Sequence, residues 1–190
     1  MPTARSDRDS VDLASLMHEI VRAIAHLTAP WQSLYSSSKA VSWFVTSLHL
    51  LGLLFAGGMA VSADRAVLRA LRRGAEARRR LLDELEAVHG PVILALMVLV
   101  SSGVALALAD VETFLRSPLF WTKMLLVSLL GLNGYRVMRA GSDLRIEAEK
   151  GALMAASSEK LWRRLRRAAG GSVVLWVVLV AIGAALVESA

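Results

Sequence analysis

Long apolar runs separated by charged segments dominate this sequence. Four runs reach the length of about 20 residues that one crossing of the hydrocarbon core requires, namely residues 41–62, 89–109, 117–137 and 169–187. Runs of this length predict transmembrane helices. We therefore expect an all-α fold, in which an integral membrane four-helix bundle covers residues 41–187.

A different pattern precedes the first run, in residues 1–40. Apolar residues recur there at spacings of three and four and stop before Pro30: Val11, Leu13, Leu16, Met17, Ile20, Val21, Ile24 and Leu27. This pattern predicts an amphipathic helix over about residues 10–28. Its polar face lacks an excess of Lys and Arg, and we expect the helix to lie in the outer membrane interface or to cap the bundle.

The basic residues set the expected orientation of the chain. Of its 22 Lys and Arg residues, 16 lie in the two segments 64–88 and 136–168. Cytoplasmic loops of membrane proteins carry such an excess, so both segments are expected to lie in the cytoplasm. They are rich in Ala, Leu, Glu and Arg, and we expect them to prolong the membrane helices. Both termini then lie outside, and residues 1–40 form an exported tail.

The composition agrees with this interpretation and narrows the chemistry. Hydrophobic residues make up 55% of the 190 residues, which is too apolar for an ordinary soluble domain. The net charge of +6 would suggest nucleic acid in a soluble protein. Because the basic residues flank apolar runs, we instead expect a lipid bilayer and no nucleic acid as the partner. The lack of cysteine excludes disulfides and thiolate metal sites.

No hydrolase or transferase motif occurs in the sequence, so an enzymatic role is open only for redox chemistry. Ionisable side chains inside the spans are the candidate sites, because each costs several kcal/mol in hydrocarbon. A helix rise of about 1.5 Å per residue places His49 and Lys123 at a similar depth, roughly 10 Å below the outer boundary. Ser101 and Ser102 reach about the same level on the second span, with Met97 about a turn deeper. We expect an outer polar layer.

A second polar group falls near the inner boundary and consists of Asp64, His89 and Asn133. Headgroups and arginine-rich loops are close there, so structural roles are favoured, and Asn133 is expected to tie helices together by hydrogen bonds. His49 and His89 differ in depth by roughly 20 Å, which prevents them from ligating one haem within the chain.

Three interpretations of His49 stay open. In the first, His49 is an axial ligand of a b-type haem, with Met97, Met124 or another protomer as the second ligand and Lys123 near a propionate. In the second, the chain transports copper or another small ion, which His49 binds together with Met97 or Met124. Thioethers are soft ligands for Cu(I). In the third, the chain is a structural or accessory membrane subunit whose polar residues lock the bundle.

The tryptophans add an expectation about depth. Trp43 and Trp121 fall at the outer headgroup level and Trp162 at the inner one, where amphipathic indoles are preferred. Trp176 falls in the middle of the last span and is expected to be packed. Glycines on all four spans favour close contact between the helices.

Two stretches of the chain carry a family resemblance. The first is WFVTSLHLLGLLFAGG, which contains His49 and is followed by Asp64 and Arg65. The second is LFWTKMLLVSLLGLN, with the spaced residues Phe120, Lys123 and Asn133. On these stretches, residues 36–187 resemble small bacterial four-helix membrane proteins of unknown function, which are distantly similar to the membrane domain of copper-resistance protein D (CopD).

The resemblance implies a bacterial inner membrane and one of two chemistries. These are copper handling, as in CopD-like proteins, and a b-type haem, as in the similar four-helix membrane cytochromes. It also allows a homo-oligomer or a partner membrane subunit. The segment ADRAVLR departs from the family's Asp-Leu-Arg run, so the resemblance assigns no role to this loop. The exported part lacks a His-rich or Met-rich segment, which disfavours copper.

Overall fold

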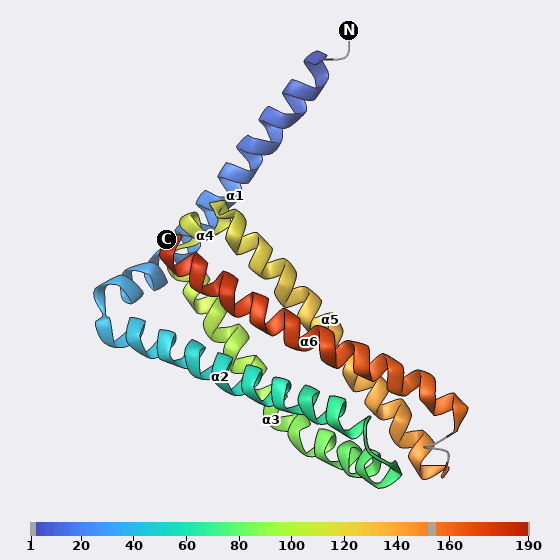
Figure 1. The fold of residues 1–190 in the computed structure, drawn as a ribbon. Coiled ribbons are helices and arrows are strands. Elements are labelled where there is room, and N and C mark those ends of the chain that lie inside the picture. Colours follow the sequence, from blue (N-terminus) through green and yellow to red (C-terminus); the bar gives the residue numbers. More distant parts are fainter. Residues whose placement is uncertain (1–2, 152–154, 190) are drawn as a thin grey trace.

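The computed structural model describes the backbone of residues 3–151 and 155–189 (Figure 1). Six helices follow one another in this part of the chain: α1 (Thr3–Ser37), α2 (Lys39–Ala70), α3 (Ala75–Ala109), α4 (Val111–Arg116), α5 (Pro118–Glu149) and α6 (Ala156–Ser189). The described residues contain no strand. The all-α prediction is therefore confirmed for them.

Within the described residues, three helices are long and apolar enough to cross a membrane, namely Lys39–Ala70, Ala75–Ala109 and Ser158–Leu186. They contain the predicted spans 41–62 and 89–109 and nearly all of the span 169–187. This is typical of a membrane protein. Helix α5 holds the other predicted span and is of similar length, but Lys123, Asn133 and Arg136 lower its mean hydropathy. A crossing by α5 stays a prediction.

The long helices pack as two hairpins (Figure 1). Helices α2 and α3 form one hairpin, and α5 and α6 form the other. Helix α2 also contacts α6, and α3 also contacts α5, while the short α4 joins α3 to α5. Helix α1 contacts α2, α3 and α4. The candidate site residues therefore lie on helices that have two long neighbours each.

The arginine-rich segments are mostly helical, as the sequence predicts. Helix α2 continues to Ala70 and α3 begins at Ala75, so only a short turn interrupts the segment 64–88. Helix α5 continues to Glu149 and is followed by Gly151, whose φ of 70° is the left-handed conformation that commonly ends helices. The extension of the membrane helices is thus confirmed within the described residues.

Helix α1 does not end at Pro30, as the pattern predicts, but continues to Ser37. A proline inside a helix removes one backbone hydrogen bond. Just beyond it, the indole Nε1 of Trp31 donates to the carbonyl oxygen of Ala105 in α3, at 2.9 Å. This contact stabilises the last turns. Residues 10–18 of the predicted amphipathic face lie outside the described side chains, whereas Val21 is buried and Leu27 is 79% exposed.

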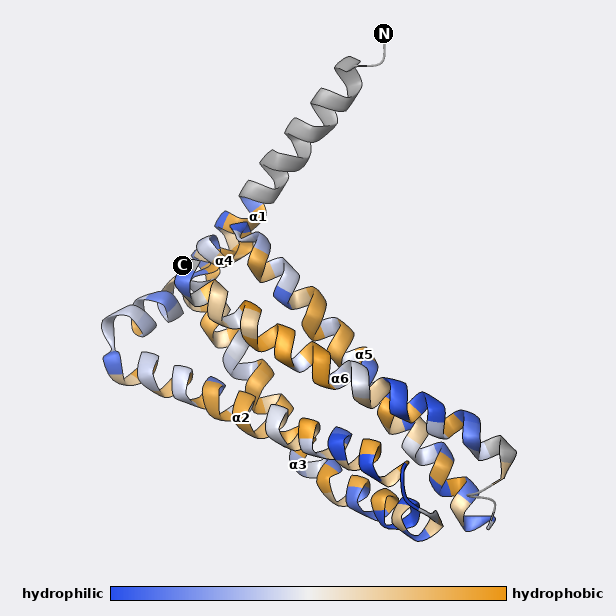
Figure 2. Cartoon of the chain, in the orientation of Figure 1, coloured by the Kyte–Doolittle hydropathy of each residue, from blue (hydrophilic) through white to orange (hydrophobic). Residues whose placement is uncertain are grey.

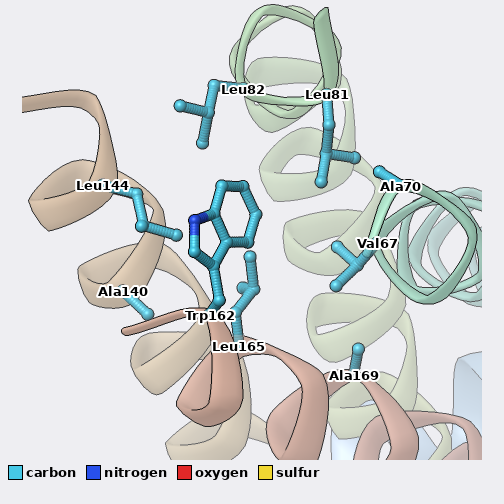
Figure 3. Close-up of a cluster of buried hydrophobic side chains, with 9 residues drawn as sticks. All are labelled: Val67, Ala70, Leu81, Leu82, Ala140, Leu144, Trp162, Leu165 and Ala169. Carbon is cyan, nitrogen blue, oxygen red and sulfur yellow. The ribbon is translucent and has the colours of Figure 1, made fainter. Parts of the chain in front are cut away.

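A hydrophobic cluster joins the two hairpins at the arginine-rich end of the molecule (Figure 3). It takes residues from α2, α3, α5 and α6: Val67, Ala70, Leu81, Leu82, Ala140, Leu144, Trp162, Leu165 and Ala169. The indole of Trp162 is 1% exposed, and the guanidinium carbon of Arg78 lies 5.1 Å from its ring centroid. Trp162 is therefore enclosed by apolar side chains of four helices, while its predicted level at the inner membrane interface stays a prediction.

Of the other predictions for tryptophans, the packing of Trp176 is confirmed, while the outer level of Trp43 and Trp121 stays a prediction. Trp43 and Trp121 are exposed on the helix surface, and the indole of Trp121 donates to the carbonyl oxygen of Leu115. Trp176 is buried, and a Cβ placed on Gly57 would lie 3.3 Å from its ring. Trp176 is therefore packed in the close contact between α2 and α6.

Large apolar side chains are exposed along the remainder of the helices (Figure 2). They include Phe44, Leu54, Leu94, Leu125 and Val177. In a soluble protein such a surface would mark an interface or an aggregation hazard. Lipid tails are as apolar as these side chains, so a bilayer covers them without cost.

Replacing Trp162 by Ala is expected to lower the free energy of unfolding by about 3–5 kcal/mol, the usual effect of truncating a core aromatic residue. Trp43→Ala is the matched control, because it removes the same atoms from a side chain that is 75% exposed. Thermal denaturation of both variants in mild detergent measures the difference. Equal losses would contradict the assignment of the core to the Trp162 cluster.

Candidate functional site

His49 of α2 is held by two groups of α3. Its Nδ1 atom lies 3.2 Å from the carbonyl oxygen of Leu99 and 3.1 Å from Oγ of Ser102. The Ser102 hydroxyl itself donates to the carbonyl oxygen of Val98, at 2.7 Å. Since a hydroxyl has one proton and a carbonyl has none, both neighbours of Nδ1 are acceptors. Nδ1 therefore carries the proton, and the lone pair of the neutral imidazole is on Nε2.

Two glycines bring the helices close enough for this contact. A Cβ on Gly52 of α2 would lie 3.0 Å from the backbone of Leu99, and a Cβ on Gly103 of α3 would lie 3.1 Å from Cε1 of His49. Ser102, another small residue, is buried between them. Small residues at a helix interface allow this close approach of the two backbones.

Lys123 of α5 lies against α6. Its Nζ atom lies 4.0 Å from the position of a Cβ on Gly183 of that helix. The side chain is half-buried. The structure thus brings His49 and Ser102 together, and a common outer polar layer with Lys123 stays a prediction.

The methionines are placed differently. Met97 is 56% exposed on α3, and Met124 follows Lys123 on α5 and is half-buried. Met97 precedes Ser102 by five residues, which turns it about 140° around the helix from the face that contacts His49. A pairing of Met97 or Met124 with His49 around a metal ion or haem iron stays a prediction. Among the described residues, no group of three or more His, Cys, Asp or Glu is arranged to hold a metal ion.

An inner polar layer lies closer to the arginine-rich end. The amide Nδ2 of Asn133 in α5 donates to the carbonyl oxygen of Ala168 in α6, at 2.8 Å, which confirms its predicted role as a tie between helices. Asp64 of α2 is buried and accepts a hydrogen bond from Ser172 of α6, while its Oδ2 has no partner among the described residues. His89 is exposed. The sequence analysis did not identify Ser172. The run of small residues GGS in the last span could have indicated a close helix contact at this position.

These features define a helical membrane protein in which a half-buried imidazole joins two long helices. No protein-family model, no curated protein and no solved structure matches the chain. The resemblance to CopD-related proteins therefore stays a prediction based on the stretches around His49 and Lys123.

Replacing Gly52 by Ala is expected to lower the free energy of unfolding by about 1–3 kcal/mol, because the new methyl group meets the backbone of Leu99, which cannot move by itself. Gly58→Ala is the matched control on the same helix, since a Cβ there has no neighbour within 4 Å. Alanine's higher helix propensity should make that change neutral or slightly stabilising. Thermal denaturation in detergent compares the two, and a neutral Gly52→Ala would refute the close packing of α2 on α3.

Proposed function

We propose that this chain is an integral protein of a bacterial inner membrane that binds a b-type haem through Nε2 of His49. The observation that supports it best is the pair of acceptors around Nδ1 of His49. Histidines that ligate metals usually donate their other ring N–H to a backbone carbonyl or a similar acceptor, which fixes the tautomer and the ring orientation. His49 has this arrangement.

The membrane topology we propose has four crossings, by α2, α3, α5 and α6, with both termini outside. The arginine-rich segments 64–88 and 136–168 support a common cytoplasmic side for the ends of these helices. A crossing by α5 is supported by its polar residues, because Lys123 and Asn133 contact α6. We place α1 in the outer interface, where the exposed Leu27 would contact lipid.

Single cysteines test the four crossings without background, since the natural chain has no cysteine. A membrane-impermeant maleimide should label Ser36→Cys and Glu112→Cys in intact spheroplasts, and Glu84→Cys and Glu149→Cys only after permeabilisation. All four side chains are exposed. Labelling of Glu112→Cys and Glu149→Cys from the same side would rule out a crossing by α5.

The residues of this chain supply some of the groups that hold a haem. Nε2 of His49 would bind the haem iron, and Lys123 would pair with a propionate. Met97, Met124, a second copy of this chain or a partner membrane subunit would give a second ligand. A haem bound here would supply one-electron transfer. The contacts of His49 with α3 hold the imidazole in an orientation suited to such a ligand.

Spectroscopy of the purified protein tests this function. We expect a Soret band and sharp reduced bands in wild-type protein from haem-replete and copper-replete cells, recorded oxidised and after dithionite. His49→Ala should lose these bands. His89→Ala, a change at an exposed histidine, should keep them. Ser102→Ala should also keep them, because the carbonyl of Leu99 still accepts the Nδ1 proton.

The contact between His49 and Ser102 also supports a second function. In this alternative the chain is an accessory membrane subunit, and the contact only holds α2 and α3 together. A colourless and metal-free wild type, with melting temperatures lowered by both His49→Ala and Ser102→Ala, would replace the haem proposal by this one. Metal analysis of the same samples addresses the CopD-like alternative. Stoichiometric copper that disappears in His49→Ala would favour copper transport.

A further inference from the structure

A basic groove with a volume of about 460 Å³ opens between α5 and α6 near their arginine-rich ends. Two arginines from each helix line it: Arg136, Arg139, Arg164 and Arg167. Asp143 also lines the groove, so four positive charges and one negative charge give it a formal net charge of 4 − 1 = +3. The volume falls in the range of about 300–1,000 Å³ that is common for ligand sites.

The arginines of this groove are arranged in pairs that face one another, which distinguishes them from basic residues scattered along the helix ends. Each helix contributes a pair at spacing i, i+3, which places the two guanidinium groups of a pair on one helix face. The faces of α5 and α6 then meet across the groove. Figure 2 shows the hydrophilic N-terminal part of α6 next to α5.

Carboxylates neutralise some arginines elsewhere in the structure, but they leave most of this groove charged. Arg145 pairs with Asp83 and Glu86, and Arg80 pairs with Glu76. In contrast, no described carboxylate forms a salt bridge with Arg136, Arg164 or Arg167.

Tyr135 lines the groove as well, and its hydroxyl accepts a hydrogen bond from Arg139, at 3.1 Å. This bond raises the pKa of Arg139, with a further contribution from the charge of Asp143. The groove therefore presents several guanidinium donors that face no described anion.

The groove lies at the depth where lipid headgroups are expected. This depth points to a lipid headgroup as the anion that the arginines bind. Arg136 lies at the end of the predicted span 117–137, and Arg167 lies just before the span 169–187. Asn133 closes the membrane side of the groove by its bond to Ala168. The arginines are thus at headgroup level, and basic pockets between membrane helices on the cytoplasmic side bind anionic headgroups.

An apolar path continues from the groove along both helices. Leu129 and Leu132 of α5 and Val174 and Val177 of α6 are exposed large apolar side chains within about three turns of the arginines. Acyl chains would lie against them while the phosphate oxygens meet the guanidinium groups, whose planar donors bind phosphate in a bidentate manner. A free phosphate compound would leave this apolar path unused.

We propose that the groove between α5 and α6 binds the headgroup of an anionic phospholipid of the inner leaflet, with a lipid that carries two phosphates preferred over one that carries a single phosphate. The two arginine pairs fit two phosphate groups, and the net charge of +3 balances a charge of −2 better than a charge of −1. The proposal depends on the crossing of α5 and α6 but not on a haem at His49.

Lipid binding by the whole chain tests the proposal. Delipidated protein in mild detergent receives cardiolipin, phosphatidylglycerol, phosphatidylethanolamine or inorganic pyrophosphate, and native mass spectrometry and thermal shift follow binding. We expect the affinity to fall in the order cardiolipin, phosphatidylglycerol, phosphatidylethanolamine. The variant with Arg136, Arg139, Arg164 and Arg167 all changed to Gln should lose at least about tenfold in affinity for cardiolipin. The control changes Arg72, Arg73, Arg79 and Arg80 to Gln and should lose less than about threefold.

Asp143→Asn separates binding from folding, because removing the negative charge should strengthen cardiolipin binding, a gain that a damaged fold cannot produce. If the fourfold variant does not fold, the two double variants, one on each helix, take its place and should each lose affinity. Equal losses in the groove and control variants would overturn the proposal in favour of general charge attraction. Pyrophosphate that stabilises the protein as strongly as cardiolipin would overturn the lipid as the ligand.

Discussion

Apolar side chains from all four long helices meet in one cluster around Trp162, at the arginine-rich end of the molecule (Figure 3). Burial of apolar surface stabilises helix packing in water, whereas helices gain little from excluding lipid tails. Elsewhere along the helices, large side chains such as Leu54 and Val177 are exposed instead. The relative position of the two hairpins therefore depends strongly on this cluster.

Single polar contacts connect the long helices in pairs. His49 joins α2 to α3, Ser172 joins α6 to Asp64 of α2, and Asn133 joins α5 to α6. Each such bond in a membrane contributes on the order of 1 kcal/mol. The glycines add close backbone contact, most directly Gly52 against Leu99. The position of the proposed haem ligand thus depends on a few small contributions.

The sequence was sufficient for features that depend on residue type and spacing along one helix. It predicted helices that continue through the arginine-rich segments, and the tie made by Asn133. It failed where a neighbouring helix decides the outcome. Helix α1 continues past Pro30 because Trp31 bonds to α3. The spacing within one segment also gives no sign of the cluster in which four helices surround Trp162.

The composition of the Trp162 cluster has a consequence for synthesis. Val67, Leu81 and Leu82 leave the ribosome with the first hairpin, whereas Trp162 lies 162 − 82 = 80 residues after Leu82. At about 5–20 residues per second, these side chains wait roughly 4–16 s for the tryptophan that covers them. The newborn first hairpin is during that time a membrane-anchored intermediate with an uncovered apolar end, and it is the stage at which quality-control proteases and chaperones have access to this protein.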